Sequence, residues 1–213
     1  MSEKEFLEKD LGLKYDLVPL SPEPNKSEYF MIVAKKDFGD VKSGDTGGII
    51  GKNVVLSHDG ECWVYNDSVV DGNVVILGDS KIKGDTFIRS KKRLTIFNST
   101  IEDSMIKLKT KTNMEYCRIM NGCIENSKDF ISLDPDESMT AYVDRDKKQL
   151  VLITDGCEYP YELQLGLCLI NYSNRFDKIL KDVIKFKNKH VNINLKRIVS
   201  KRTKRGEKKN DID

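Results

Sequence analysis

The sequence predicts a mainly β protein whose central part is a parallel β-helix built from hexapeptide repeats. A six-residue period runs from Gly60 to Arg89. Gly or Asn opens each hexad, a small or β-branched residue stands third and an aliphatic residue fifth. A short fixed period of this kind is typical of a β-helix. An antiparallel meander of short strands is the alternative, but a meander has no reason to keep a strict six-residue spacing.

Each hexad is expected to form one short strand and one corner. Because a single hexad cannot bury its own apolar face, the coils must stack and share a core. Gly and Asn suit the corners, since they accept backbone angles that branched residues resist. The expected inward residues are Val64, Val70, Ile76, Ile82 and Ile88. The small residues expected at the bends are Cys62, Ser68, Ser80 and Thr86.

If three hexads make one coil, residues 54–127 supply about four coils. After Arg89 the hexads stop, and Ser90–Arg93 is expected to form a loop or an irregular coil. A related pattern returns with a five-residue spacing at 98–106 and 116–124, while the polar stretch 107–113 is expected to bulge out. Whether residues 98–127 continue the same β-helix stays open at this point.

Residues 1–53 are predicted to form an N-terminal β cap. It would hold a short helix over 1–14, strands over 15–20 and 29–35, and a glycine-rich turn segment over 36–48. That segment lacks the Gly-Lys-Ser/Thr ending of a phosphate-binding loop, and no helix pattern follows it. Trp63 is either an outward-facing interface anchor or a residue covered by the N-terminal strands; the covered arrangement is preferred.

Residues 128–192 are predicted to form a small α/β cap that closes one end of the β-helix, because an open end would expose strand edges and core. Strands are expected over 130–133, 140–143 and 149–154, and an amphipathic helix over 174–190. Residues 193–213 form a basic tail that is either a disordered segment or an electrostatic arm for nucleic acid.

Composition excludes several classes of protein. Charged residues make up 33% and hydrophobic residues 38% of the chain, and the net charge is +2. No apolar run approaches the length of a membrane span, and no signal peptide is recognised. The cysteines number five, and no Cys-x-x-Cys pair occurs among them. We therefore expect reduced thiols in a cytoplasmic protein, with no metal site, cofactor or membrane partner.

Two segments carry a resemblance to a known family. Lys36–Gly48 matches a "KDFG-VK-GD-GG" pattern, and Leu56–Tyr65 matches an "LS–G–WVY" pattern. Together with the hexads, the chain resembles a bacteriophage and prophage family of hexapeptide-repeat, polymer-forming-like proteins over residues 29–89. The resemblance implies a left-handed β-helix in the host cytoplasm. Proteins similar in fold often form homotrimers, so we expect a trimer here.

The first functional hypothesis is a non-enzymatic, phage- or prophage-encoded protein that inhibits or sequesters a host factor. It would act against host defence, in the manner of an anti-CRISPR or a signal-sequestering protein. The partner would be a host protein or a phosphate-bearing ligand, with nucleic acid binding through the basic tail. The candidate contacts are Arg89, Lys91, Lys92, Arg93, Lys201, Arg202, Lys204 and Arg205.

Two alternatives stay open. Many hexapeptide-repeat proteins are acyltransferases, which need a general base, usually histidine. The chain has only His58 and His190. His190 would end the C-terminal helix, which leaves His58 as a weak candidate base. The second alternative is a structural or assembly protein that stacks end to end, although a cap at each end argues against it.

Overall fold

The computed structural model describes residues 12–134, 139–144, 149–153, 161–162, 182 and 185–186. The chain divides into two compact units, Met1–Gln164 and Leu165–Asp213. In the second unit, Asp182, Lys185 and Phe186 are helical, in agreement with the helix predicted there. Most of the helix predicted over 1–14 and the whole basic tail, with Lys201, Arg202, Lys204 and Arg205, lie outside the described residues; positions 12–14 are not helical.

The first unit begins with an antiparallel sheet of β1 (Tyr15–Pro19), β2 (Tyr29–Ala34) and β3 (Thr46–Gly51), with a short 3-10 helix η1 (Pro24–Lys26) between β1 and β2. The first two strands confirm the prediction. The third corrects it, because the Gly47-Gly48 pair lies in a strand and not in a turn. A Cβ on Gly48 would lie 2.4 Å from the Ser68 carbonyl oxygen. Glycine allows β3 to approach the first coil closely.

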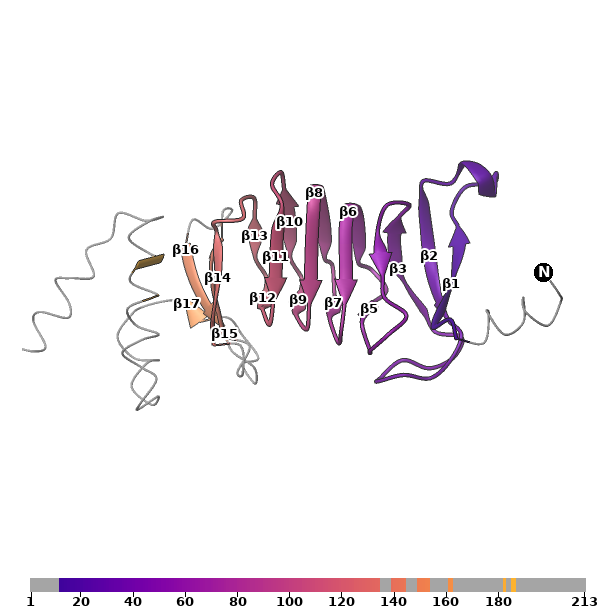
Figure 1. Ribbon diagram of the computed structural model, residues 1–213, viewed down its shortest axis with the longest axis horizontal. Coiled ribbons are helices and arrows are strands. Elements are labelled where there is room, and N and C mark those ends of the chain that lie inside the picture. The colour runs from indigo at the N-terminus through magenta and orange to yellow at the C-terminus, as the bar shows by residue number, and fades with distance from the viewer. Residues whose placement is uncertain are drawn as a thin grey trace, which may run out of the picture. The chain divides into compact units, whose positions relative to one another are not determined.

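The following strands form a parallel β-helix of about four turns (Figure 1). They are β4 (Val55–Leu56), β5 (Trp63–Val64), β6 (Val69–Leu77), β7 (Lys81–Lys83), β8 (Phe87–Phe97), β9 (Thr100–Glu102), β10 (Met105–Leu108), β11 (Thr112–Glu115), β12 (Arg118–Met120) and β13 (Cys123–Ile124). Val69 pairs with Phe87, Phe87 with Met105 and Met105 with Cys123, so along this row the coils return after 18 residues. This return confirms three hexads per coil.

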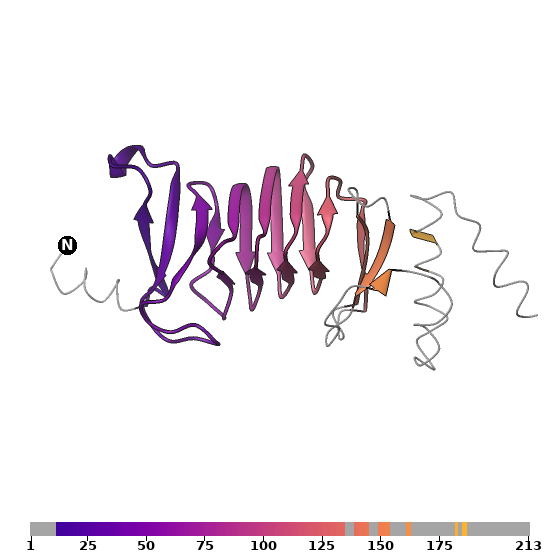
Figure 2. The same ribbon diagram turned by 180° about the vertical axis from the view of Figure 1, so that it is seen from behind.

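Aliphatic ladders fill the inside of the coils. The stacked sets are Val64, Ile82, Ile101 and Ile119; Val70, Ile88, Ile106 and Ile124; and Ile76, Ile96 and Met114. All of these side chains are 0% exposed. The five inward residues predicted from the hexads are confirmed, and the ladders show that residues 98–127 continue the same β-helix. β6 pairs with β8, and β8 pairs with both β10 and β11 of the next coil. Seen from behind, the strands of successive coils lie side by side (Figure 2).

The small residues at the bends have a second role besides fitting tight space. The Ser80 hydroxyl oxygen accepts the backbone N–H of Ser99 at 3.2 Å, and the Ser99 hydroxyl accepts that of Cys117 at 2.9 Å. At another corner, Gly78 has φ +64°, and the Asn98 side-chain oxygen accepts the N–H of Asp79 at 3.0 Å. Side chains of one coil therefore satisfy backbone groups of the coil beside it.

The break in the hexads after Arg89 is an extrusion of one corner. Gly72 pairs with Ser90 and Val74 with Leu94, so residues 91–93 lie opposite Asn73 alone. The next coil inherits the longer corner, because Ser90 pairs with Leu108 and Leu94 with Thr112, which leaves residues 109–111 between them. Of the two alternatives predicted for 90–93, the loop is wrong, since these residues lie within β8; the irregular coil agrees with the register shift opposite residues 91–93. The bulge predicted over 107–113 comprises only residues 109–111, because 107–108 belong to β10 and 112–113 to β11.

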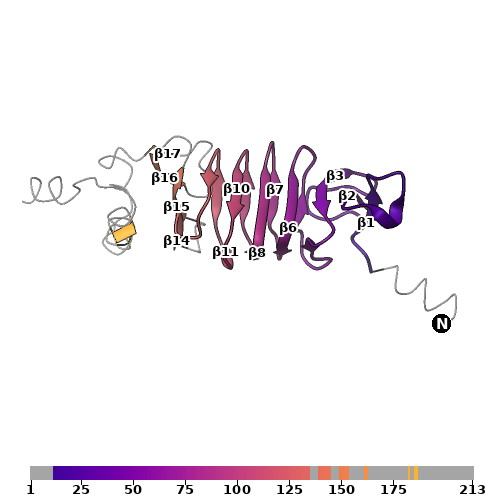
Figure 3. The ribbon, with the colours of Figure 1, turned by 90° about the horizontal axis from the view of Figure 1, so that it is seen from above.

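A second antiparallel sheet closes the far end of the β-helix. It comprises β14 (Phe130–Asp134), β15 (Met139–Asp144), β16 (Gln149–Ile153) and β17 (Tyr161–Glu162), which confirms the three strands predicted there. The backbone N–H of Arg118 donates to the Thr140 hydroxyl at 2.9 Å, and the Tyr142 hydroxyl donates to the Met120 carbonyl. From above, β14 to β16 follow β11 at this end (Figure 3).

The N-terminal end is closed by aromatic residues and one lysine. Trp63 is 2% exposed and meets the rings of Phe38 and Tyr15 edge-on, which confirms the covered arrangement. The Lys14 side chain is 1% exposed. Its Nζ donates to the carbonyl oxygens of Gly60 at 3.2 Å and Cys62 at 2.9 Å. This ammonium group satisfies carbonyls of the first coil, as a neighbouring coil would.

Candidate functional site

The extruded corner gathers exposed cations from two successive coils. We call this set the basic corner: Arg89, Lys91, Lys92, Arg93, Lys107, Lys109 and Lys111. The first four were predicted from the sequence as contact residues. Lys107, Lys109 and Lys111 were not, and the signal that finds them is the 18-residue return that aligns Arg89 with Lys107.

A hollow of about 1000 Å³ opens at the basic corner. Its lining includes Arg89, Lys91, Lys107, Lys109, Asn53 and Asn73. A volume of this size suits a small-molecule ligand. Lys92, Arg93 and Lys111 belong to the same corner but do not line the hollow.

Local contacts hold the corner in shape. Arg89 Nε lies 3.0 Å from Asp71 Oδ2, and Asp71 Oδ1 accepts the N–H of Gly72 at 2.7 Å. The Ser90 hydroxyl donates to the Lys92 carbonyl at 2.6 Å, which braces the extruded segment from inside. In the described part of the chain, Arg89 is the one cation of this corner that pairs with a carboxylate. The lysines are therefore available to an external anion.

The side chains of this corner are of the kind that binds anions. Lysine ammonium groups and the arginine fork donate charge-assisted hydrogen bonds that suit phosphate groups, and the Asn53 and Asn73 amides can donate and accept. Ser90 does not offer a nucleophile, because its hydroxyl is 2% exposed and donates to a carbonyl.

His58 lies at a different corner, beside the N-terminal cap. Its Nδ1 accepts the backbone N–H of Lys14 at 3.1 Å, and its ring stacks on Tyr15 with centroids 4.4 Å apart. Burial, followed by the charges of Lys14 and Lys36, lowers the pKa of His58. The neutral ring with Nδ1 as acceptor carries its proton on Nε2. In this arrangement Nε2 is a donor, and neither nitrogen is free to take a proton from a substrate.

A second hollow, of about 600 Å³, is lined by Asp40 and Tyr65 among others, and these two side chains belong to a closed hydrogen-bond network. Asp40 Oδ1 accepts from the Tyr65 hydroxyl at 2.6 Å and from Lys81 Nζ at 2.7 Å. The Lys81 hydrogen bond, followed by that of Tyr65, lowers the pKa of Asp40 to about 2. Burial, followed by the Asp40 hydrogen bond, raises the pKa of Tyr65. Both groups keep their protonation state near neutrality, so this network is structural.

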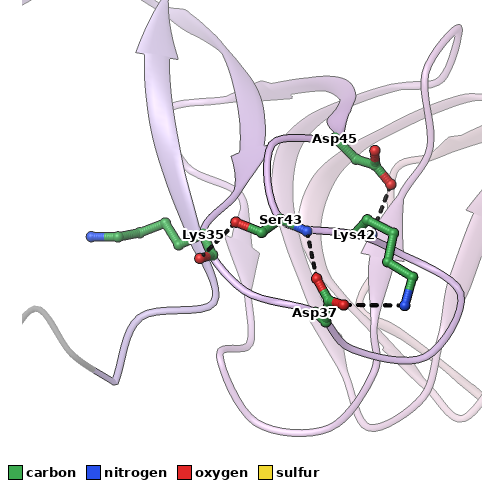
Figure 4. A network of polar contacts seen from close by, with 5 residues as sticks. All are labelled: Lys35, Asp37, Lys42, Ser43 and Asp45. Carbon is green, nitrogen blue, oxygen red and sulfur yellow. Dashed lines mark hydrogen bonds and ion pairs between the residues drawn. The ribbon is translucent and has the colours of Figure 1, made fainter.

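The glycine-rich segment also turns its polar groups on itself (Figure 4). The backbone N–H of Ser43 donates to Asp37 at 2.9 Å, and that of Lys42 donates to Asp45 at 2.8 Å. The Ser43 hydrogen bond, followed by that of Lys42, lowers the pKa of Asp37. Because carboxylates of the segment already occupy these N–H groups, it does not present a phosphate-binding nest.

Within the described residues, no group of three or more His, Cys, Asp or Glu side chains could hold a metal ion. Among the same residues, no helix has the length and apolar character needed to cross a membrane.

The six-residue period and the parallel β-helix fit a hexapeptide-repeat protein. The chain is similar to an uncharacterized acetyltransferase, YdcK, of Escherichia coli strain K12, with 38% identity over 58 residues. This stretch is 27% of the present chain and 18% of that relative, so the chain matches only a small part of its length. No known protein-family profile matches the chain.

Proposed function

We propose that this protein is an acyltransferase of the hexapeptide-repeat class that binds the phosphate groups of an acyl-coenzyme A donor at the basic corner. The observation that carries the proposal is the hollow lined by Arg89, Lys91, Lys107 and Lys109 at an extruded corner of the β-helix. The similarity to an acetyltransferase supports the choice of donor. Coenzyme A carries several phosphate groups, and this hollow offers several cations to receive them.

In this proposal the donor would be bound by described residues of the basic corner. Lys91, Lys107 and Lys109 would each donate to phosphate oxygens, while the Arg89 guanidinium, held by Asp71, would offer a fixed fork. Transfer of the acyl group also requires removal of a proton from the acceptor. His58 does not supply that base in the observed geometry, because its Nδ1 already accepts a hydrogen bond. The proposal therefore assigns no base within the described residues.

Calorimetric titration with acetyl-coenzyme A, followed by an assay of thiol release with amine acceptors, tests the proposal. The double variant Lys91→Gln/Lys109→Gln should bind the donor at least about tenfold more weakly, because two charge-assisted contacts are lost. The matched control is Lys26→Gln/Lys42→Gln, two exposed lysines of the N-terminal region that form ion pairs with Glu23 and Asp37. Absence of donor binding, or equal binding by both double variants, would refute the proposal.

A second candidate is the non-enzymatic binding protein, which the geometry of His58 favours. In this case the basic corner sequesters a phosphate-bearing signal or contacts a host protein, and the chain acts in the host cytoplasm as a phage- or prophage-encoded anti-defence factor. Native mass spectrometry of protein purified from cells with active defence systems tests it. A retained nucleotide-sized mass or host protein, without thiol release, supports this candidate; a bare protein contradicts it.

We also propose that the protein is a homotrimer. An outward row runs along one face of the β-helix through Val69, Phe87, Met105 and Cys123, and Met105 is 44% exposed. A flat, partly apolar face of this kind suits closed packing around a symmetry axis. Light scattering coupled to size-exclusion chromatography should give three times the chain mass of 24.4 kDa; a concentration-independent monomer would contradict the trimer.

A further inference from the structure

The basic corner extends beyond the hollow that a small ligand would occupy. Lys92, Arg93 and Lys111 are exposed on the extruded segments but do not line the hollow. We propose that the basic corner binds the sugar–phosphate backbone of a nucleic acid along the axis of the β-helix. This binding function shares the basic corner with the proposed donor site, but it does not depend on acyl transfer.

Like charges stack between adjacent coils of the basic corner. Arg89 pairs with Lys107 in adjacent coils, and residues 91–93 lie one coil from residues 109–111, because the flanking pairs are in register. Neighbouring strands of a sheet are about 4.8 Å apart. Cations on neighbouring strands repel each other, and among them Asp71 forms an ion pair only with Arg89. A bound polyanion relieves that repulsion and contacts the cations of both coils together.

The composition of the basic corner differs from that of a typical protein–protein interface. Protein interfaces are depleted in lysine and have a core rich in aromatic and other apolar residues. The basic corner contains five lysines, and no large hydrophobic side chain is exposed within residues 89–93 and 107–111. A phosphate backbone needs only cations and hydrogen-bond donors. The composition of the corner therefore favours a nucleic acid over an acidic protein.

The extruded segments of the basic corner carry cations but no aromatic side chains. Phe87 lies below Lys107, whose Nζ is 5.7 Å from the ring centroid, and its side chain is only partly exposed. No aromatic residue occurs within the extruded segments 91–93 and 109–111 to provide a platform for base stacking. Binding should consequently follow the backbone, with little preference for sequence and a strong dependence on salt.

Fluorescence anisotropy of the full chain with labelled 20-nucleotide single-stranded DNA, single-stranded RNA and a 20-base-pair duplex tests the proposal at 50–300 mM KCl. The variant Lys92→Gln/Arg93→Gln/Lys111→Gln should bind at least about tenfold more weakly to oligomers of any sequence. Its log–log salt slope should fall by about 2 on single strands, since each lost phosphate contact removes about 0.7. The probe that binds most tightly identifies the kind of nucleic acid that the basic corner prefers.

The control variant Lys26→Gln/Lys42→Gln/Lys52→Gln removes the same charge from exposed lysines of the N-terminal region. It should bind like the unaltered protein. If both triple variants lost the same affinity, the effect would depend on net charge alone, and the proposal would be overturned. Unchanged binding in the first variant would place the binding elsewhere in the chain and also overturn it, as would absence of binding at 50 mM KCl.

Two further measurements exclude trivial outcomes. Polyglutamate of equal charge should compete poorly with the oligonucleotides; equal competition would make the corner a general polyanion surface and refute the assignment to nucleic acid. The single variant Lys92→Gln guards against misfolding of the triple variant. It should lower the salt slope by about 0.7 with an unchanged urea midpoint, and an unchanged slope would count against the proposal.

Discussion

Replacement of Lys14 by methionine tests whether a buried ammonium group closes the first coil of the β-helix. The Lys14 side chain is 1% exposed. Its Nζ donates to Gly60 O at 3.2 Å, to Cys62 O at 2.9 Å and to Cys62 Sγ at 3.4 Å, and it lies 5.0 Å from the centre of the Phe38 ring. Methionine keeps most of the apolar stem but removes every donor.

The expected loss follows from these contacts. Leaving a buried acceptor without its donor costs about 1–3 kcal/mol, and the contact with the Phe38 ring contributes about 0.5–2 kcal/mol. Removing the buried charge offsets part of this loss, because desolvation of an ammonium group is costly. We expect Lys14→Met to lower the free energy of unfolding by about 2 kcal/mol. Lys14→Ala should lose about 2 kcal/mol more, since about three buried methylenes disappear.

Urea unfolding followed by tryptophan fluorescence measures the effect where it arises, because Trp63 is the one tryptophan of the chain and contacts Phe38. The control is Lys36→Met, which removes the same charge from an exposed side chain and should change the free energy of unfolding by less than about 0.5 kcal/mol. If Lys14→Met is as stable as the unaltered protein, desolvation outweighs the hydrogen bonds and the assigned role of Lys14 is wrong.

Two further predictions concern corners. Gly78→Ala should lower the free energy of unfolding by about 2–4 kcal/mol, because Gly78 has φ +64° and a new Cβ would lie 2.1 Å from Asn98 Oδ1. The control Gly44→Ala, also at positive φ but with open space around it, should lose clearly less stability. Equal urea midpoints of the two variants would contradict the steric argument. Folding lowers the pKa of His58 below 6.5, so the contribution of His58 to stability is complete above pH 6.5 and is lost as the pH falls through the lowered pKa. NMR titration of the folded protein should show the lowered pKa. Between pH 7.5 and 5.5, the urea midpoint of His58→Gln should fall less than that of the unaltered protein.

Much of the fold could be predicted from the sequence because residues of the same chemical type recur at the same positions of the six-residue repeat. Val64 and Ile82 recur at the position that faces inward, and Ser80 at the position where space is tight. The strand β3 was missed, because the local preference of Gly47-Gly48 for turns conceals a requirement that arises only from contact with the first coil. That requirement is tertiary, and no short window of sequence contains it.

The sequence predicted only part of the basic corner, because the rest depends on contact between coils. Arg89, Lys91, Lys92 and Arg93 form a visible run, whereas Lys107, Lys109 and Lys111 alternate with other residues. Their proximity depends on the coil register, which the irregular stretch after Arg89 obscures. His58 was a reasonable candidate base by residue type, but the acceptor role of Nδ1 depends on the Lys14 backbone 44 positions away. Hydrogen-bond direction of this kind cannot be deduced from composition.

The side-chain ladders at the corners have a consequence for how this protein can change in length. The Ser80 hydroxyl accepts the backbone N–H of Ser99, and the Ser99 hydroxyl accepts that of Cys117, so the coil of Ser99 both donates to and accepts from its neighbours. Removing or duplicating one whole coil joins equivalent positions and preserves every ladder. Removing a single residue from a strand turns inward side chains outward. The length of the β-helix is therefore quantised, and evolution can add or delete 18 residues more easily than one.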